Sequence, residues 1–192
     1  MMKLKLKKEA RRARVHQGHP WVFANEIDVL PDSSMDGKAL PLEDVRGRFI
    51  GMGIVNTQSQ IIWRRFSTRE TSWGEGFFRK ALEEAHRNRE DEPYRRLVWS
   101  EADDLPGLVV DQFEDVLVVQ ALTRAVDAAL PAINDLLKEL LAPREILLRN
   151  DAPTRRKEGL ELYARTVSGQ PLAPFWGQIY NVWYKLDLAG AQ

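Results

Sequence analysis

The chain has 192 residues and a mass of 22.1 kDa, which suits one large domain or two small ones. A composition of 44% hydrophobic and 29% charged residues excludes a disordered or collagen-like protein. There is no cysteine, so these residues supply no disulfide, no thiolate metal ligand and no thiol nucleophile. No apolar run approaches the ~18 residues that span a bilayer, and no signal-peptide core follows the basic N-terminus. We therefore expect a cytoplasmic location and no membrane partner.

The formal net charge of zero conceals two regions of opposite sign. Residues 1–70 contain 13 Lys+Arg against 8 Asp+Glu, a net charge of +5, and the remaining residues have a net charge of −5. A basic region joined to an acidic one favours a polyanionic partner for the first alone. The alternative is that both regions are merely solvated.

In chain order, the pattern is first that of β-strands. Leu4 and Leu6 alternate with lysines, which predicts a strand with one wet face. Trp21 and Phe23 also alternate, so we expect both rings in the core. The β-like pattern continues to residue 69. The glycines of 51–53 lack the third glycine and the following helix of a nucleotide loop, and they indicate bends within a strand.

The composition changes around residues 67–76, where Ser, Thr and Gly accumulate, and we place a domain boundary there. Ser72 and Glu75 have the spacing of a capping box, and apolar residues then recur at helical intervals. This predicts a helix from about residue 75 to 90.

The remainder alternates strands with one further helix. Residues 97–99, 107–113 and 116–122 are rich in β-branched side chains and predict a meander, with a turn at Glu114 and Asp115. An amphipathic helix is expected at 133–141, with Pro131 near its first turn. A strand at 145–149, a helical turn at 155–160 and a terminal strand at 179–188 follow. The order strand, strand, helix, strand, strand predicts a small α+β domain.

The basic first region contains the best candidates for a binding site, because Lys and Arg bind phosphates and aromatic rings stack on bases. The predicted RNA-binding residues are Lys7, Lys8, Arg11, Arg12, Arg14, His19, Arg64 and Arg65. A second mixed cluster is predicted to contact either RNA or the other domain, or to form only a solvated turn. Its members are Arg149, Asn150, Asp151, Arg155 and Arg156.

Two other site hypotheses are weaker. His16 and His19 have no thiolate partner and no helical spacing, so we expect structural histidines and no metal. The acidic residues near position 104 can be an acidic turn, or an acid/base or cation site. They are Glu101, Asp103, Asp104 and Asp111.

Three phrases carry a resemblance to a known family: HPWVF at 19–23, SEADDLPGLVVDQF at 100–113 and RNDAPTRRKEGL at 149–160. In this order they resemble the bacterial 23S rRNA cytosine-5 methyltransferases that have an N-terminal PUA domain. The resemblance implies a PUA-like β pseudo-barrel over 1–70 and the family's central α+β domain over 75–188. Residues 189–192 resemble the beginning of a third, Rossmann-like domain, which in that family binds S-adenosylmethionine and carries the catalytic cysteine.

The expected fold class is therefore α+β, with a PUA-like barrel, a strand-strand-helix-strand-strand domain and no Rossmann-like catalytic domain. Cytosine C5 becomes nucleophilic only after a thiolate adds to C6. We expect no catalytic, cofactor-binding or metal-binding residue in this chain, with S-adenosylmethionine belonging to the full-length parent. The expected function is to bind and orient rRNA for a methyltransferase. The chain by itself is expected to be catalytically inactive, and a homodimer is compatible with this function. The alternative is a freestanding PUA-type RNA-binding adaptor.

Overall fold

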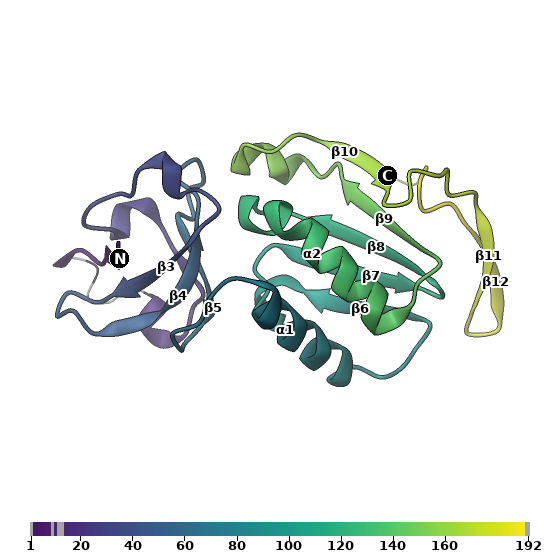
Figure 1. Ribbon diagram of the computed structural model, residues 1–192, viewed down its shortest axis with the longest axis horizontal. Helices are drawn as coiled ribbons and strands as arrows, with labels where there is room; N and C mark the ends of the chain where they lie inside the picture. Colours follow the sequence, from purple (N-terminus) through teal and green to yellow (C-terminus); the bar gives the residue numbers. More distant parts are fainter. Residues whose placement is uncertain (1, 9, 11–13, 191–192) are drawn as a thin grey trace.

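A computed structural model describes residues 2–8, 10 and 14–190. Two sheets lie side by side, and a hairpin projects from the end of the molecule opposite the first sheet (Figure 1). Arg11 and Arg12, both predicted to bind RNA, lie outside the described residues.

The first sheet has five strands in the order β1-β3-β4-β5-β2. β1 is parallel to β3, and the other pairs are antiparallel. A bridge between Leu6 and Ile27 brings the two edges together, so the sheet curls back on itself. The strands are β1 (Leu4–Lys5), β2 (Trp21–Val22), β3 (Ala39–Glu43), β4 (Phe49–Val55) and β5 (Trp63–Ser67). Short 3-10 turns are η2 (Arg14–Gln17), η3 (Ala24–Glu26) and η4 (Ser33–Met35).

The core of this sheet confirms two expectations. Leu4 and Leu6 are buried while Lys5 between them is exposed, as the alternation predicts. Gly53 lies at a register shift in β4, and a Cβ there would overlap the buried ring of Trp63. The strand glycines therefore allow a close approach of backbone and indole.

The expected burial of Trp21 and Phe23 is wrong. Val22 is the fully buried residue, and the rings on either side of it are only partly buried. Because side chains alternate across a strand, burying Val22 turns Trp21 to the other face. That face points toward the second domain, where Trp21 has a polar partner.

The second sheet also has five strands, in the order β10-β9-β8-β7-β6. β8 and β9 are parallel, because helix α2 crosses over between them, and the other pairs are antiparallel. Helices α1 and α2 cover one face (Figure 1). The elements are α1 (Glu75–Arg87), β6 (Tyr94–Trp99), η5 (Ser100–Asp103), β7 (Leu108–Phe113), β8 (Val116–Ala121), α2 (Arg124–Leu141), β9 (Glu145–Asn150), η6 (Pro153–Glu158) and β10 (Tyr163–Thr166).

The expected strand-strand-helix-strand-strand domain is therefore wrong. The meander of β7 and β8 is confirmed, but β6 and β10 complete a mixed sheet of five strands. β10 was not expected because Tyr-Ala-Arg-Thr has no apolar alternation. It becomes a strand by pairing along β9, a contact that local sequence does not encode.

The predicted capping box of α1 is also wrong. The helix begins at Glu75 with Gly74 as its N-cap, and no side chain caps it. Backbone N–H groups of Phe77 and Phe78 donate to the carbonyl of Gly74. Trp73 packs against Phe66 and Phe77 with ring centroids 4.9 Å and 5.6 Å away, and this packing fixes where the chain turns into the helix.

Helix α2 begins earlier than expected, because Thr123 is its N-cap and Pro131 lies in its interior. Pro131 has no N–H for a helical bond, but its side chain is exposed. The open turn is therefore on the solvent side, where water can bond the freed carbonyl.

The expected terminal strand is in fact the second half of a hairpin, β11 (Phe175–Ile179) paired with β12 (Val182–Leu186). Tyr180 and Asn181 form its two-residue turn, with φ of 48° and 64°. Across the described part of the chain, no helix has the length and apolar character needed to cross a membrane.

Candidate nucleic-acid interface

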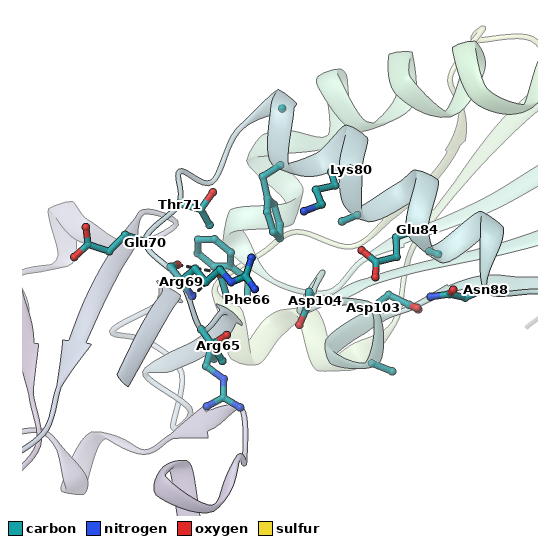
Figure 2. A pocket seen from close by; sticks show the side chains of 17 residues that line it. Arg65, Phe66, Arg69, Glu70, Thr71, Lys80, Glu84, Asn88, Asp103 and Asp104 are labelled. Carbon is teal, nitrogen blue, oxygen red and sulfur yellow. Dashed lines mark hydrogen bonds between the residues drawn. The ribbon is translucent and has the colours of Figure 1, made fainter. Parts of the chain in front are cut away.

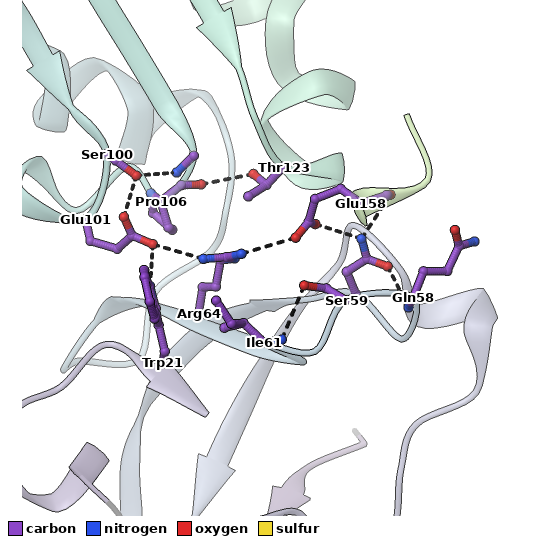
Figure 3. A network of polar contacts seen from close by, with 12 residues as sticks. Trp21, Gln58, Ser59, Ile61, Arg64, Ser100, Glu101, Pro106, Thr123 and Glu158 are labelled. Atoms are coloured by element: carbon purple, nitrogen blue, oxygen red, sulfur yellow. Dashed lines mark hydrogen bonds and ion pairs between the residues drawn. The ribbon is translucent and has the colours of Figure 1, made fainter. Parts of the chain in front are cut away.

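Arg64 on β5 joins the two domains. Its Nη1 donates to Oε1 of Glu101 over 3.3 Å, and its Nη2 donates to Oε1 of Glu158 over 3.2 Å (Figure 3). The Arg64 side chain is 16% exposed and that of Glu158 5% exposed. A guanidinium shared by two carboxylates of the other domain fixes the relative position of the sheets.

Glu101 is the most connected of these acids. Its Oε1 accepts from the indole Nε1 of Trp21 over 2.5 Å, and its Oε2 accepts from the Ser100 hydroxyl. Burial by itself raises the pKa of Glu101, but the hydrogen bonds from Ser100 and Trp21 hold that pKa below its ordinary value. Glu101 is therefore an ionised acceptor. We call Trp21, Arg64, Glu101 and Glu158 the junction clamp.

The Glu158 end of the clamp is held by the first domain as well. The side-chain amide of Asn56 donates to Oε2 of Glu158 over 2.7 Å and to its backbone carbonyl over 3.1 Å. The next residue, Gly159, has φ of +69°, and a Cβ there would overlap the Gln58 amide. Glycine favours this left-handed backbone geometry and leaves room for the Gln58 amide.

The three phrases that carry the family resemblance meet at this junction. HPWVF supplies Trp21, SEADDLPGLVVDQF supplies Glu101, and RNDAPTRRKEGL supplies Glu158. They are far apart in sequence and converge around Arg64 (Figure 3). The three sequence segments therefore contribute residues to the contact between the two domains, in addition to any role in binding.

The predicted RNA-binding residues divide into two groups. Arg64 is in the junction clamp, where two carboxylates compensate its charge. Arg65 points the other way and donates to the carbonyl of Gly18, beside the η2 turn. The remaining described members are Lys7, Lys8, Arg14 and His19, and together with Arg65 we call them the basic surface.

Backbone contacts bring parts of the basic surface together. The Lys7 N–H donates to the carbonyl of Glu26 over 2.9 Å, and a Glu26 carboxylate oxygen accepts from the Phe23 N–H over 2.8 Å. The Arg14 guanidinium lies 5.5 Å from the centre of the Phe23 ring. Lys8 and Arg14 are exposed. Such charges can bind a polyanion, because each phosphate contact releases counterions.

A groove of about 680 Å³ lies beside Arg65, between the end of β5, the linker and helix α1 (Figure 2). Arg65 and Arg69 lie on the first-domain side, while Lys80 and Glu84 project from α1. Asp103 and Asp104 lie at the end of the groove near η5. The wall of the groove thus mixes cations with carboxylates, since Glu70 lies beside Arg69 and Asp104 lies near Arg65.

The acidic cluster does not converge on a common point. Asp103 is held by Arg89 at 2.6 Å, and Asp111 is held by Arg96 at 2.7 Å. Burial raises the pKa of Asp104, and nearby Glu84 adds to the effect. Within residues 2–8, 10 and 14–190, no group of three His, Asp or Glu side chains is arranged to hold a metal ion.

The second predicted cluster is mostly occupied with its own domain. Arg149 bonds Asp151, with Nη2 2.9 Å from Oδ2. Buried Asn150 accepts from the Ala121 N–H over 2.7 Å. Arg155, 1% exposed, donates to the carbonyls of Ala121 and Glu161 and to Asp127. Arg156 is the one exposed cation of this second cluster.

Sequence reasoning missed the clamp roles of Trp21, Glu101 and Glu158. A weak signal was present, because each lies in one of the three phrases. Asn56, which holds Glu158, lies in none of them. Its role depends on a contact between residues 102 positions apart.

The chain is similar to a known domain family and to known proteins. The family profile described as a PUA-like domain matches residues 4–68. Ribosomal RNA large subunit methyltransferase I from Cronobacter sakazakii is 29% identical over 171 residues, which cover 84% of this chain and 43% of that protein. The protein of the same name from Klebsiella pneumoniae is 28% identical over 169 residues, covering 84% and 42%.

Two solved structures share the fold. One, described as a SAM-dependent methyltransferase from Streptococcus mutans, has a TM-score of 0.74 at 15% identity and covers 96% of this chain and 48% of its own. Another methyltransferase structure, complexed with SAH, has a TM-score of 0.81 at 15% identity and covers 100% and 49%. The chain thus contains a PUA-like domain and is homologous to rRNA large subunit methyltransferases. It spans less than half the length of these relatives.

These comparisons correct the expected fold class. The expected fold was a PUA-like barrel followed by a small α+β domain, with no Rossmann-like catalytic domain, yet solved structures described as methyltransferases match across 96–100% of the chain. The mixed sheet of β6–β10 is part of that shared fold. The fold of this chain, with both of its sheets, is therefore shared with about half of each of these structures.

Proposed function

We propose that this chain binds and orients ribosomal RNA for an S-adenosylmethionine-dependent methyltransferase that modifies C5 of a cytosine in 23S rRNA. The observation that carries the proposal is that similarity to rRNA large subunit methyltransferases covers 84% of the chain, extending beyond the PUA-like match at 4–68. The domain division at about residues 70–75 is part of the same proposal.

The junction clamp supplies the physical reason for binding and orientation to occur together. If the first domain were loosely tethered, its basic surface would bind RNA without fixing the orientation of the RNA relative to the second domain. Because Arg64 is bonded to two acids of the second domain, RNA held by the first domain keeps a defined orientation relative to the second. Firm holding matters for base chemistry, because the target base must leave its stack.

Methyl transfer to C5 requires a thiolate that adds to C6, and these 192 residues contain no cysteine. In this proposal the chain alone methylates no cytosine, and both the thiolate and the seat for S-adenosylmethionine come from residues outside it. The alternative function, an RNA-binding adaptor, shares the RNA surface and differs in having no methyltransferase partner.

The test is the affinity for a 23S rRNA fragment across a salt series. Each single-strand phosphate contact contributes about 0.7 to the log–log salt slope, so Lys7→Ala/Lys8→Ala/Arg14→Ala should lower the slope by up to roughly 2. The comparison variant is Arg156→Ala/Lys157→Ala, which removes two exposed cations of the second domain. If the salt slope is unchanged in the first variant and lowered in the second, the RNA-binding surface lies on the second domain and its assignment to the first domain is wrong.

A further inference from the structure

The β11–β12 hairpin exposes two tryptophans on one face. Trp176 pairs with Lys185 across the hairpin, and Gln178 pairs with Trp183. Cross-strand partners and residues two apart share a face, so the outer face consists of Trp176, Gln178, Trp183 and Lys185. Each tryptophan is 61% exposed.

The opposite face fixes how the hairpin is held. Phe175 lies under the Arg144 guanidinium, 5.3 Å from its ring centre. Gly177 is buried against the Tyr94 hydroxyl, where a Cβ would overlap it. The outer face therefore points away from the second domain, and its two tryptophan rings do not pack into the core of that domain.

From this arrangement we infer that the outer hairpin face binds unpaired RNA bases by stacking on Trp176 and Trp183. Diagonal neighbours on a ribbon lie about 7–8 Å apart, which is close to the thickness needed for one base between two rings. Stacking on aromatic rings tolerates any base sequence, because every base has a π-face. The inference rests on the proposed RNA function and adds a second contact at the far end of the molecule (Figure 1).

The polar members of this face favour RNA over a protein partner. A dry protein interface would bury the Lys185 ammonium and the Gln178 amide, and Lys is depleted from such interfaces. A nucleotide offers the rings a flat surface and offers Lys185 and Gln178 acceptor oxygens. Burying Lys185 and Gln178 would therefore cost desolvation free energy in a dry protein complex, whereas in an RNA complex both side chains can donate hydrogen bonds.

The test compares a single-stranded RNA dodecamer, oligo(U), with an RNA duplex of the same length. Trp176→Ala/Trp183→Ala should weaken single-strand binding about tenfold or more, because each stacked base contributes strongly. Its salt slope should stay that of the unmodified chain, because no phosphate contact is removed. Duplex binding should change little, since paired bases cannot stack on the hairpin.

Two variants make the result specific. Trp176→Phe/Trp183→Phe keeps aromatic faces and should retain most of the single-strand affinity. Val182→Ala/Tyr184→Ala removes half-exposed apolar side chains from the opposite face. This variant should bind single-stranded RNA with unchanged affinity. Sedimentation velocity of every variant reports self-association.

The outcomes separate this inference from the proposed function. If the unmodified chain binds RNA and Trp176→Ala/Trp183→Ala binds it equally well, the inference is overturned and the proposed function stands. If both double-alanine variants lose affinity equally, or only the sedimentation changes, the hairpin is a protein contact and the inference is overturned. If the unmodified chain binds the 23S rRNA fragment but not oligo(U), the inference is overturned and the proposed function stands. If it binds neither oligo(U) nor the 23S rRNA fragment, both are overturned.

Discussion

The two domains use their basic side chains differently. In the second domain, arginines pair with carboxylates of the same domain: Arg89 with Asp103, Arg96 with Asp111, and Arg155 with Asp127. In the first, Lys3 pairs with Glu43 and Arg48 with Asp44, but the cations of the basic surface form no ion pair with any described residue. Arg64 pairs across the junction. The arginines that pair within the second domain thus stabilise that domain, whereas the cations of the basic surface are available to bind a polyanion.

The largest effect that tests this comparison concerns Arg155. Replacing it with methionine keeps apolar volume but leaves the buried Ala121 carbonyl without its donor, so the free energy of unfolding should fall by about 3 kcal/mol. Urea unfolding measures this. Exposed Arg156→Ala should change it by less than about 0.5 kcal/mol. Equal effects would show that Arg155 is not part of a compensated scaffold.

The junction clamp gives the next largest effect. Arg64→Ala leaves the buried Glu158 carboxylate without its cation and should lower the free energy of unfolding by about 2 kcal/mol. Losing the clamp should also separate unfolding into two transitions, because the domains would no longer unfold together.

Arg79→Ala is the matched control for the clamp. Arg79 likewise bridges two glutamates, Glu75 and Glu139, but on an exposed surface. Its loss should cost less than about 1 kcal/mol. A larger loss in Arg79→Ala than in Arg64→Ala would contradict the distinction between buried and exposed pairs.

The smallest effect concerns an acid of the first domain held by backbone groups. Hydrogen bonds from the Arg48 and Arg46 N–H groups lower the pKa of Asp44 to about 2. Its pKa in the unfolded chain is about 3.9, so its contribution is present above that pH and is lost as the pH falls toward 2.

Asp44→Asn should flatten the pH dependence of the free energy of unfolding between about pH 4 and 2. Unfolding measured across that range, with the unmodified chain alongside, checks it. Identical curves would mean that this turn does not depend on the charge of Asp44.

The sequence by itself determined the local features. Alternation of Leu4 and Leu6 marked a strand face, the strand glycines marked a bend, and the β-branched runs marked the meander of β7 and β8. These features depend on the period of a strand and on steric freedom at single residues, which neighbouring letters express directly. The unequal charge of the two halves was equally visible.

Only the tertiary structure decided the rest. Burial of Val22 reversed the expected face of Trp21, aromatic packing by Trp73 moved the beginning of α1, and pairing with β9 made β10 a strand. Arg64 and Arg65 are adjacent in sequence, yet one joins the domains and the other lies at the basic surface. Partners 37 and 94 residues away determine the role of Arg64, and no local pattern records contacts at such separations.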